Sequence, residues 1–187
     1  MQANALTVIH KFIRNELFEV SRRLACADPA DPGDVRDAIE ALAVTLRTHE
    51  AEEDASLEID LRAADTGLAA RMAADHQRLD DELERICLIA RALEGTDPQR
   101  CAAILTRLHL DWNRFVSAYL AHLDDEERVL FPTIAAHLPP LEAVAQDAVR
   151  DPRADEFLRK LASMLTPHER AAIEQARGAH SRQLSRA

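Results

Sequence analysis

The sequence predicts an all-α protein: an antiparallel up-down-up-down four-helix bundle followed by a short C-terminal helical extension. The 187 residues are rich in Ala, Leu, Arg and Glu, which favour helices, and they include only 4 Gly. Apolar residues recur at steps of about three and four residues, the period of an amphipathic helix. Short breaks containing Pro, Gly, Asp or Thr divide the chain into long segments, and short connections favour antiparallel neighbours.

The first predicted helix covers residues 4–25 and ends before the sequence ADPADPGD. The second covers residues 34–62 and ends before the sequence DTG. Asp and Pro or Gly at these breaks are typical of helix caps and turns. The apolar faces of the two helices contain Leu6, His10, Ile13, Leu17, Val20 and Leu24, and then Val35, Ile39, Leu42, Leu46, His49 and Glu53.

The third predicted helix covers residues 67–94, and the fourth covers residues 98–136 after the break EGTDPQ. Both have an apolar face with the same period. These faces contain Met72, His76, Leu79, Leu83, Ile86, Ala90 and Leu93, and then Leu105, Leu108, Trp112, Phe115, Tyr119, His122, Glu126 and Val129. We therefore assign residues 1–138 to the bundle.

Residues 139–187 follow the sequence LPP and are predicted to form the C-terminal helical extension. Its last helix begins at TPHE, where Thr166 is a candidate N-cap and Pro167 occupies the first helical position. Glu169 lies three residues after Thr166, which is the spacing of a capping box. We expect the extension to pack outside the bundle.

The net charge of −10 disfavours binding to nucleic acid or to an anionic membrane surface. No apolar run reaches the length of a membrane span, and His10, Lys11 and Arg14 interrupt the N-terminal segment. The three cysteines form no CxxC pair. These features favour a cytoplasmic protein.

Histidines and glutamates interrupt the apolar faces of the predicted helices. His49 and Glu53, and likewise His122 and Glu126, are four residues apart, so each pair projects from one side of its helix. His10 and His76 each lie on the apolar face of another helix. Because buried carboxylates without partners cost several kcal/mol or more, a bound cation is the expected compensation.

The position of these residues along the helices tests whether they can meet. At about 1.5 Å per residue, His10, the His49/Glu53 pair and His76 lie level across the first two connections. Across the third connection, His76 is about 19 residues from the turn and His122/Glu126 about 26. This predicts an offset of roughly 10 Å unless the fourth helix overshoots or tilts.

Four imidazoles and two carboxylates suit iron, manganese or zinc rather than calcium or magnesium, which prefer oxygen ligands. Two carboxylates between four imidazoles are able to bridge two ions. Each ion would then keep coordination positions for water or a small ligand. The residues leave the choice among these metals open.

The pattern resembles the hemerythrin-like, or HHE cation-binding, family over roughly residues 1–138. It rests on His10, on HEAEE at residues 49–53, on His76 and on HLDDEERVLFP at residues 122–132. The resemblance implies a non-haem di-iron centre with oxo or carboxylate bridges. It implies that His10 and His49 bind one iron, that His76 and His122 bind the other, and that Glu53 and Glu126 bridge them.

The same resemblance gives two further candidate ligands. Oxygen carriers of the family have a second His one turn after the one matching His76, whereas this chain has Asp80, so Asp80 either binds metal or leaves the position open. Relatives that sense iron use a Glu directly after the second-helix His, which makes Glu50 a candidate.

Tyr119 lies one turn before His122 and either hydrogen-bonds a metal-bound ligand or, as we expect, fills the core.

The expected function is to bind or sense dioxygen, nitric oxide or peroxide in stress response or iron handling. The alternatives are a di-iron enzyme that decomposes peroxide, reduces nitric oxide or repairs iron centres, and a zinc-binding or purely structural bundle. The sequence does not decide among these functions. It also leaves open whether the chain forms a homodimer or binds a protein partner.

Overall fold

The computed structural model describes residues 4–141 and 154–184, and this part of the chain forms helices and no strand. The predicted all-α class is therefore confirmed. The long helices are α1 (Ala5–Ala25), α2 (Gly33–Ala64), α3 (Thr66–Arg91) and α4 (Pro98–Asp125). A π-helical turn, η1 (Glu126–Leu130), and the short α5 (Phe131–Thr133) follow, and then α7 (Ala154–Ala162) and α8 (Pro167–Leu184).

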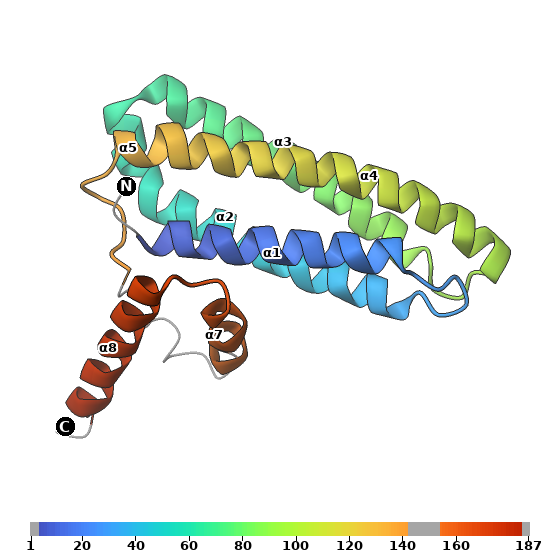
Figure 1. Ribbon diagram of the computed structural model, residues 1–187. Coiled ribbons are helices and arrows are strands. Elements are labelled where there is room, and N and C mark those ends of the chain that lie inside the picture. Colours follow the sequence, from blue (N-terminus) through green and yellow to red (C-terminus); the bar gives the residue numbers. More distant parts are fainter. Residues whose placement is uncertain (1–3, 142–153, 185–187) are drawn as a thin grey trace. The chain divides into compact units, whose positions relative to one another are not determined.

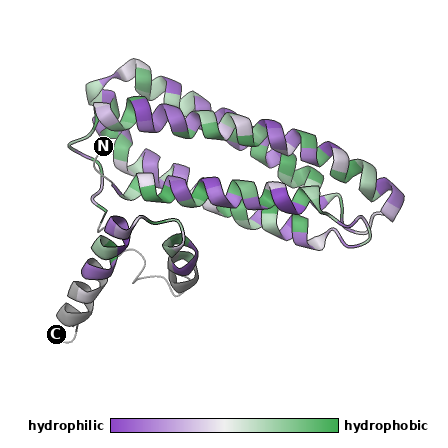
Figure 2. Ribbon diagram, viewed as in Figure 1, coloured by the Kyte–Doolittle hydropathy of each residue, from purple (hydrophilic) through white to green (hydrophobic). Residues whose placement is uncertain are grey.

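The chain divides into two compact units, Ile13–Ala135 and Met1–Phe12 with Ala136–Ala187. Helix α1 runs without interruption through both. In the larger unit, Figure 1 shows the long helices side by side. The colours follow the sequence, and they show that the chain runs in opposite directions along α2 and α3, and again along α3 and α4. Hydrophilic and hydrophobic residues alternate along these helices in Figure 2, as expected for amphipathic helices.

The predicted breaks cap the helices. The side chain of Asp65 accepts a hydrogen bond from the backbone N–H of Leu68 at the start of α3. At the start of α4, Asp97 accepts one from Arg100, and Pro98 occupies the first turn. These carboxylates satisfy N–H groups that have no partner within the helix, so both helices begin where the sequence predicts.

The end of α4 differs from the prediction of one regular helix to residue 136. The backbone N–H of Phe131 bonds to the carbonyl oxygen of Glu126, which is the i to i+5 bond of a π-helix. The extra residue in this turn shifts the helical phase. Val129, predicted to be in the core, is 40% exposed, and Leu130 is buried in its place at 5% exposure. The helical segment ends at Thr133.

The smaller unit has an apolar core of its own. Phe12 of α1 packs its ring edge-on against Phe157 of α7, with ring centroids 4.8 Å apart. The buried members of this cluster are Ala5, Val8, Phe12, Leu141, Leu161, Leu165 and Ile173. Lys11 donates to both carboxylate oxygens of Glu169 at 2.6 and 2.7 Å.

The predicted capping box at the start of α8 is confirmed. The backbone N–H of Thr166 donates to the Glu169 carboxylate, and that of Glu169 donates to the Thr166 hydroxyl. The remainder of the predicted extension, residues 142–153 and 185–187, lies outside the described residues.

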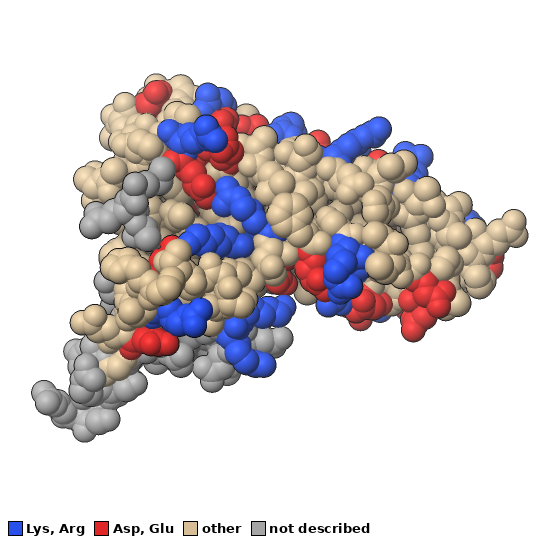
Figure 3. Space-filling model, in the orientation of Figure 1, with Lys and Arg blue, Asp and Glu red and all other residues tan. Residues whose placement is uncertain are grey.

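Lys and Arg intermingle with Asp and Glu on the face of the molecule visible in Figure 3. Among the described residues, many Lys and Arg side chains pair with Asp or Glu along or between helices. For example, Arg47 of α2 donates to Asp80 and Glu84 of α3, at 2.7 Å each. Such exposed pairs contribute little stability individually. No described helix is both long and apolar enough to span a membrane.

Candidate metal centre

The six residues predicted as metal ligands are all buried, with exposures between 0 and 9%. They come from different elements: His10 from α1, His49 and Glu53 from α2, His76 from α3, His122 from α4 and Glu126 from the first position of η1. The structure brings them together in two groups that share one residue.

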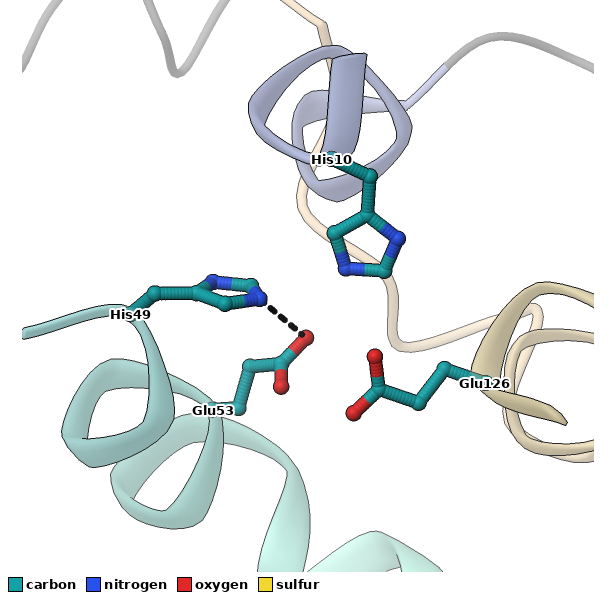
Figure 4. A group of neighbouring side chains, drawn as sticks. All are labelled: His10, His49, Glu53 and Glu126. Carbon is teal, nitrogen blue, oxygen red and sulfur yellow. Dashed lines mark ion pairs between the residues drawn. The ribbon is translucent and has the colours of Figure 1, made fainter. Parts of the chain in front are cut away.

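The first group consists of His10, His49, Glu53 and Glu126, each of which offers a ligand atom within 4.8 Å of the others. Figure 4 shows the four side chains pointing toward one another, with His49 and Glu53 both from α2, His10 from α1 and Glu126 from η1. His49 Nε2 lies 3.6 Å from Glu53 Oε1. Two nitrogen and two carboxylate donors at this spacing match the ligand set of a first-row transition metal.

The second group consists of His76, His122 and Glu126. His122 Nε2 lies 3.0 Å and His76 Nε2 lies 3.5 Å from the same oxygen, Glu126 Oε1. His76 Nε2 is also 3.9 Å from Glu53 Oε2, the second oxygen of the other carboxylate. Each carboxylate thus faces imidazoles of both groups.

The predicted offset of His76 and His122 along their helices is not found. Their ring centroids lie 4.8 Å apart. Helix α3 ends at Arg91, whereas α4 begins at Pro98 and extends past the end of α3 (Figure 1). The connection between them contains Gly95 at a φ of 68°, which is favourable for glycine. The longer α4 accounts for the difference in residue count.

Carboxylates control the protonation of His76. Burial by itself lowers the pKa of His76, but the nearby Glu126, Glu50 and Asp54 outweigh this effect and raise it to about 9. His76 therefore carries a proton at neutral pH when it binds no metal. The positive charge favoured at this position is the same charge that a metal ion would supply.

Sequence reasoning did not identify Asp54 as part of the site. Its Oδ1 lies 3.1 Å from His76 Nδ1, which leaves Nε2 directed at the carboxylates. A carboxylate in this position fixes the orientation and tautomer of a metal-binding imidazole. The one available signal was its place directly after Glu53, and that signal does not distinguish it from the other acidic residues of α2.

The two additional candidate ligands lie outside both groups. Asp80 accepts a 2.7 Å hydrogen bond from Arg47 and is partly exposed. Glu50 is partly buried, and burial raises its pKa to about 7 against the opposing effect of His76 and His122. Glu50 is therefore electrostatically coupled to the second group, whereas Asp80 is engaged by an arginine.

Tyr119 is fully buried next to the second group. Its ring centroid is 5.9 Å from that of His122, and its ring also packs against Phe115. Burial raises the pKa of Tyr119 well above its ordinary value, and Glu50 adds to the effect. Its hydroxyl has no hydrogen-bond partner among the described residues. The phenol is therefore neutral, and its hydroxyl is available to a ligand.

The donor set fits a metal centre better than a polar core without ions. Glu126 is 0% exposed and Glu53 is 4% exposed, and carboxylates buried to this degree can be ionised only with positive charge beside them. Cations held between the nitrogen and oxygen donors would supply this charge.

The model of the hemerythrin HHE cation binding domain matches residues 2–134, and a second, overlapping match covers residues 67–179. No curated protein and no solved structure matches the chain. The first match alone covers more than half of the chain, and the cluster of buried His and Glu residues agrees with a cation site. The chain belongs to the hemerythrin HHE cation-binding domain family.

Proposed function

We propose that the protein binds two iron ions and uses them to bind or sense a small ligand, such as dioxygen, nitric oxide or peroxide. The observation that carries this proposal is the position of Glu126, whose carboxylate belongs to both groups of candidate ligands. A carboxylate with imidazoles on both sides is suited to bridge two ions, whereas a single-ion site would not need the second group.

In this proposal, His10 and His49 hold one ion, and His76 and His122 hold the other. Glu126 and Glu53 bridge the ions, which is supported by the distances from Glu53 to His49 and to His76, 3.6 and 3.9 Å. Iron would supply a change of oxidation state and open coordination positions for the ligand. The protein fixes the imidazoles, neutralises the ions with carboxylates and excludes water with apolar side chains.

The scaffold in this proposal is the up-down-up-down bundle of residues 1–138, with residues 139–187 as the extension. Support comes from the short connections between consecutive long helices. Each long helix contributes at least one of the six residues, so the centre ties the helices together as in other bundles with metal sites in their cores.

Metal analysis after expression with added iron tests the proposal. We expect two irons per chain and charge-transfer absorption. Glu126→Ala should lose at least one iron, while Glu127→Ala is the matched control because Glu127 is the adjacent residue and pairs with Arg14 at 2.7 Å instead. Unchanged iron content in Glu126→Ala, or zinc retained in place of iron, would contradict the proposal.

A di-iron enzyme is the second candidate, favoured by the oxidisable ring of Tyr119 beside His122. Stopped-flow spectra separate the two functions. A stable, reversible adduct with dioxygen or nitric oxide supports binding or sensing. Rapid irreversible oxidation or consumption of peroxide, slowed in Tyr119→Phe, supports catalysis.

A further inference from the structure

A cavity of about 290 Å³ lies between α2, α3 and η1. Three of the proposed ligands line it, Glu53, His76 and Glu126, and so do the exposed carboxylates of Asp54 and Glu58. We infer that this cavity is the route by which a divalent cation enters the buried centre, and that Asp54 and Glu58 capture the cation at the surface. The inference rests on the proposed metal centre and adds how that centre is loaded.

The burial of the centre makes such a route necessary. The six proposed ligands are only 0–9% exposed, so a cation in bulk water does not reach them directly. Removing water from an ion costs several kcal/mol unless other groups replace it. A cavity of this volume admits an ion that keeps part of its hydration shell, since each water occupies about 30 Å³.

The carboxylates of the cavity extend from the surface to the interior. The side chains of Asp54 and Glu58 are 62% and 50% exposed, whereas Glu53 and Glu126 are 4% and 0% exposed. Glu58 lies about 7.5 Å beyond Glu53 along α2. Oxygen donors at both ends of the cavity would replace the waters of an entering cation in steps.

His76 connects the outer carboxylates to the inner ones. Its Nδ1 lies 3.1 Å from Asp54 Oδ1, and its Nε2 lies 3.5 Å from Glu126 Oε1. This Nε2 has no hydrogen-bond partner among the described residues, although His76 is only 9% exposed. A buried nitrogen donor in the cavity wall is a ligand atom that an entering cation meets after Asp54.

The charge of the cavity favours cations over anions. Four carboxylates line it, and Arg62 is the one Lys or Arg in its described lining. Such a lining attracts cations and repels anions. Arg62 pairs with Glu58 at 2.5 Å, but both side chains are at least half exposed. Because exposed pairs of this kind are weak, a divalent cation is able to compete for Glu58.

A second cavity, of about 270 Å³, lacks these features. Its described lining contains two acidic residues and two arginines, Glu82, Asp111, Arg85 and Arg114, and none of the six proposed ligands. Its charges balance, so it offers a cation no comparable attraction. The excess of carboxylates is therefore a property of the cavity at the centre.

Charge changes at the outer end test the route. Cobalt(II), whose visible absorption reports binding by nitrogen and oxygen donors, is mixed with the metal-free full-length chain at about 0.1 M salt. Glu58→Gln should slow uptake and Arg62→Gln should speed it, each by roughly two- to fivefold, because each changes the charge beside the path by one unit. The final cobalt content should stay at the wild-type level, since neither residue is in the two ligand groups.

Glu40→Gln and Arg91→Gln are the matched controls. They make the same charge changes at another pair, 3.0 Å apart, and neither residue lines the cavity. Glu40 lies about 27 Å from Glu58 along α2, well beyond the screening length of about 10 Å at this salt concentration. We expect both controls to take up cobalt at the wild-type rate. Equal effects at the two pairs would overturn the route.

Narrowing the cavity is an independent test. Ala73→Phe places a ring in the cavity, and Ala74→Phe adds the same ring at the next exposed position, which is outside the lining. We expect Ala73→Phe to slow cobalt uptake and its release to a chelator by the same factor, at least about tenfold, because a filled passage obstructs both directions. Ala74→Phe should match wild type. Ala73→Leu, a smaller change, replaces Ala73→Phe if the latter does not fold.

The outcomes separate the route from the proposed function. Full cobalt binding at wild-type rates in Glu58→Gln, Arg62→Gln and the narrowed variant would overturn the route and leave the metal centre intact. A wild-type chain that binds no cobalt or iron would refute the metal centre, and the route with it. Asp54 is left unchanged in these experiments, because its contact with His76 also orients the ring.

Discussion

At the residue scale, the contact between Asp54 and His76 sets the orientation of the His76 ring in the second group. Asp54 lies 3.1 Å from Nδ1 of His76, and this contact directs Nε2 toward Glu126 and Glu53. Without the carboxylate, the ring is free to rotate and to exchange tautomers. The imidazole then loses part of its basicity as a ligand.

We expect Asp54→Asn to weaken metal binding at one of the two positions by about 10- to 100-fold, the usual effect of removing a carboxylate partner. Titration with a competing chelator measures the two affinities separately. Asp81→Asn is the control, because Asp81 is an exposed residue of α3 that accepts a hydrogen bond from Gln77 of the same helix. Equal affinities for all three proteins would show that Asp54 does not position His76.

The sequence was informative about residues that break a periodic pattern. His10, His49, Glu53, His76, His122 and Glu126 could be singled out because polar side chains occurred where the period required apolar ones. Asp54 could not, because it lies outside the apolar face and its partner is on another helix. The pairing of Asp80 with Arg47 likewise depends on how α2 and α3 pack.

At the element scale, η1 sets the direction of Glu126 and the phase of the residues after it. A π-helical turn contains more residues than an α-helical turn, so the chain rotates relative to the regular pattern. The buried side becomes that of Leu130 and Phe131, and Val129 turns outward. The periodic pattern of the sequence could not predict this shift, because Val129, Leu130 and Phe131 are all apolar.

Alanine substitutions test this phase. Leu130→Ala should destabilise the larger unit by about 2–4 kcal/mol, because it leaves a cavity in the core. Val129→Ala should change stability by less than about 1 kcal/mol, because the side chain is 40% exposed. Urea unfolding of the two variants measures both effects. The reverse order of destabilisation would indicate a regular α-helix at this position.

The contact of α8 with α1 gives a pH-dependent prediction. Burial tends to raise the pKa of Glu169, but the hydrogen bonds from Lys11 and Thr166 prevail and lower it below the usual 4.5. A carboxyl group whose pKa is lower in the folded chain stabilises the fold fully above the unfolded value, and this contribution is lost as the pH falls through the folded value.

Glu169→Gln should therefore weaken the packing of α8 by about 1–2 kcal/mol at pH 7. The difference between variant and wild type should vanish as the pH falls below the folded pKa of Glu169. Hydrogen exchange of the α8 amides at several pH values measures this. A difference that persists unchanged at low pH would exclude the ion pair as its source.

At the scale of the whole molecule, residues from four long helices meet in one cluster of buried His and Glu side chains, which is the candidate cation site. Composition, period and helix caps were sufficient to predict the all-α class and the positions of the long helices to within a few residues. Such features are local, whereas the pairing of helices and the cavity beside His76 depend on side chains from several helices.

Metal removal should lower the melting temperature by about 5–10 °C, because ions that bind only the folded chain contribute a few kcal/mol of stability when they are present well above their dissociation constants. Glu126→Ala should respond much less to the chelator, since its sites are already impaired. Scanning calorimetry with and without chelator checks both outcomes. An equal fall in melting temperature for wild type and Glu126→Ala would show that the stabilising metal is not bound at the proposed centre.

Anomalous diffraction at the iron edge tests the central claim most directly. We expect two peaks about 3.5–4 Å apart, the usual separation in two-metal sites. One peak should lie beside His10 and His49, the other beside His76 and His122, and the Glu126 carboxylate should lie between them. A single peak, or crystals grown with iron that show none among these side chains, would contradict the di-iron centre.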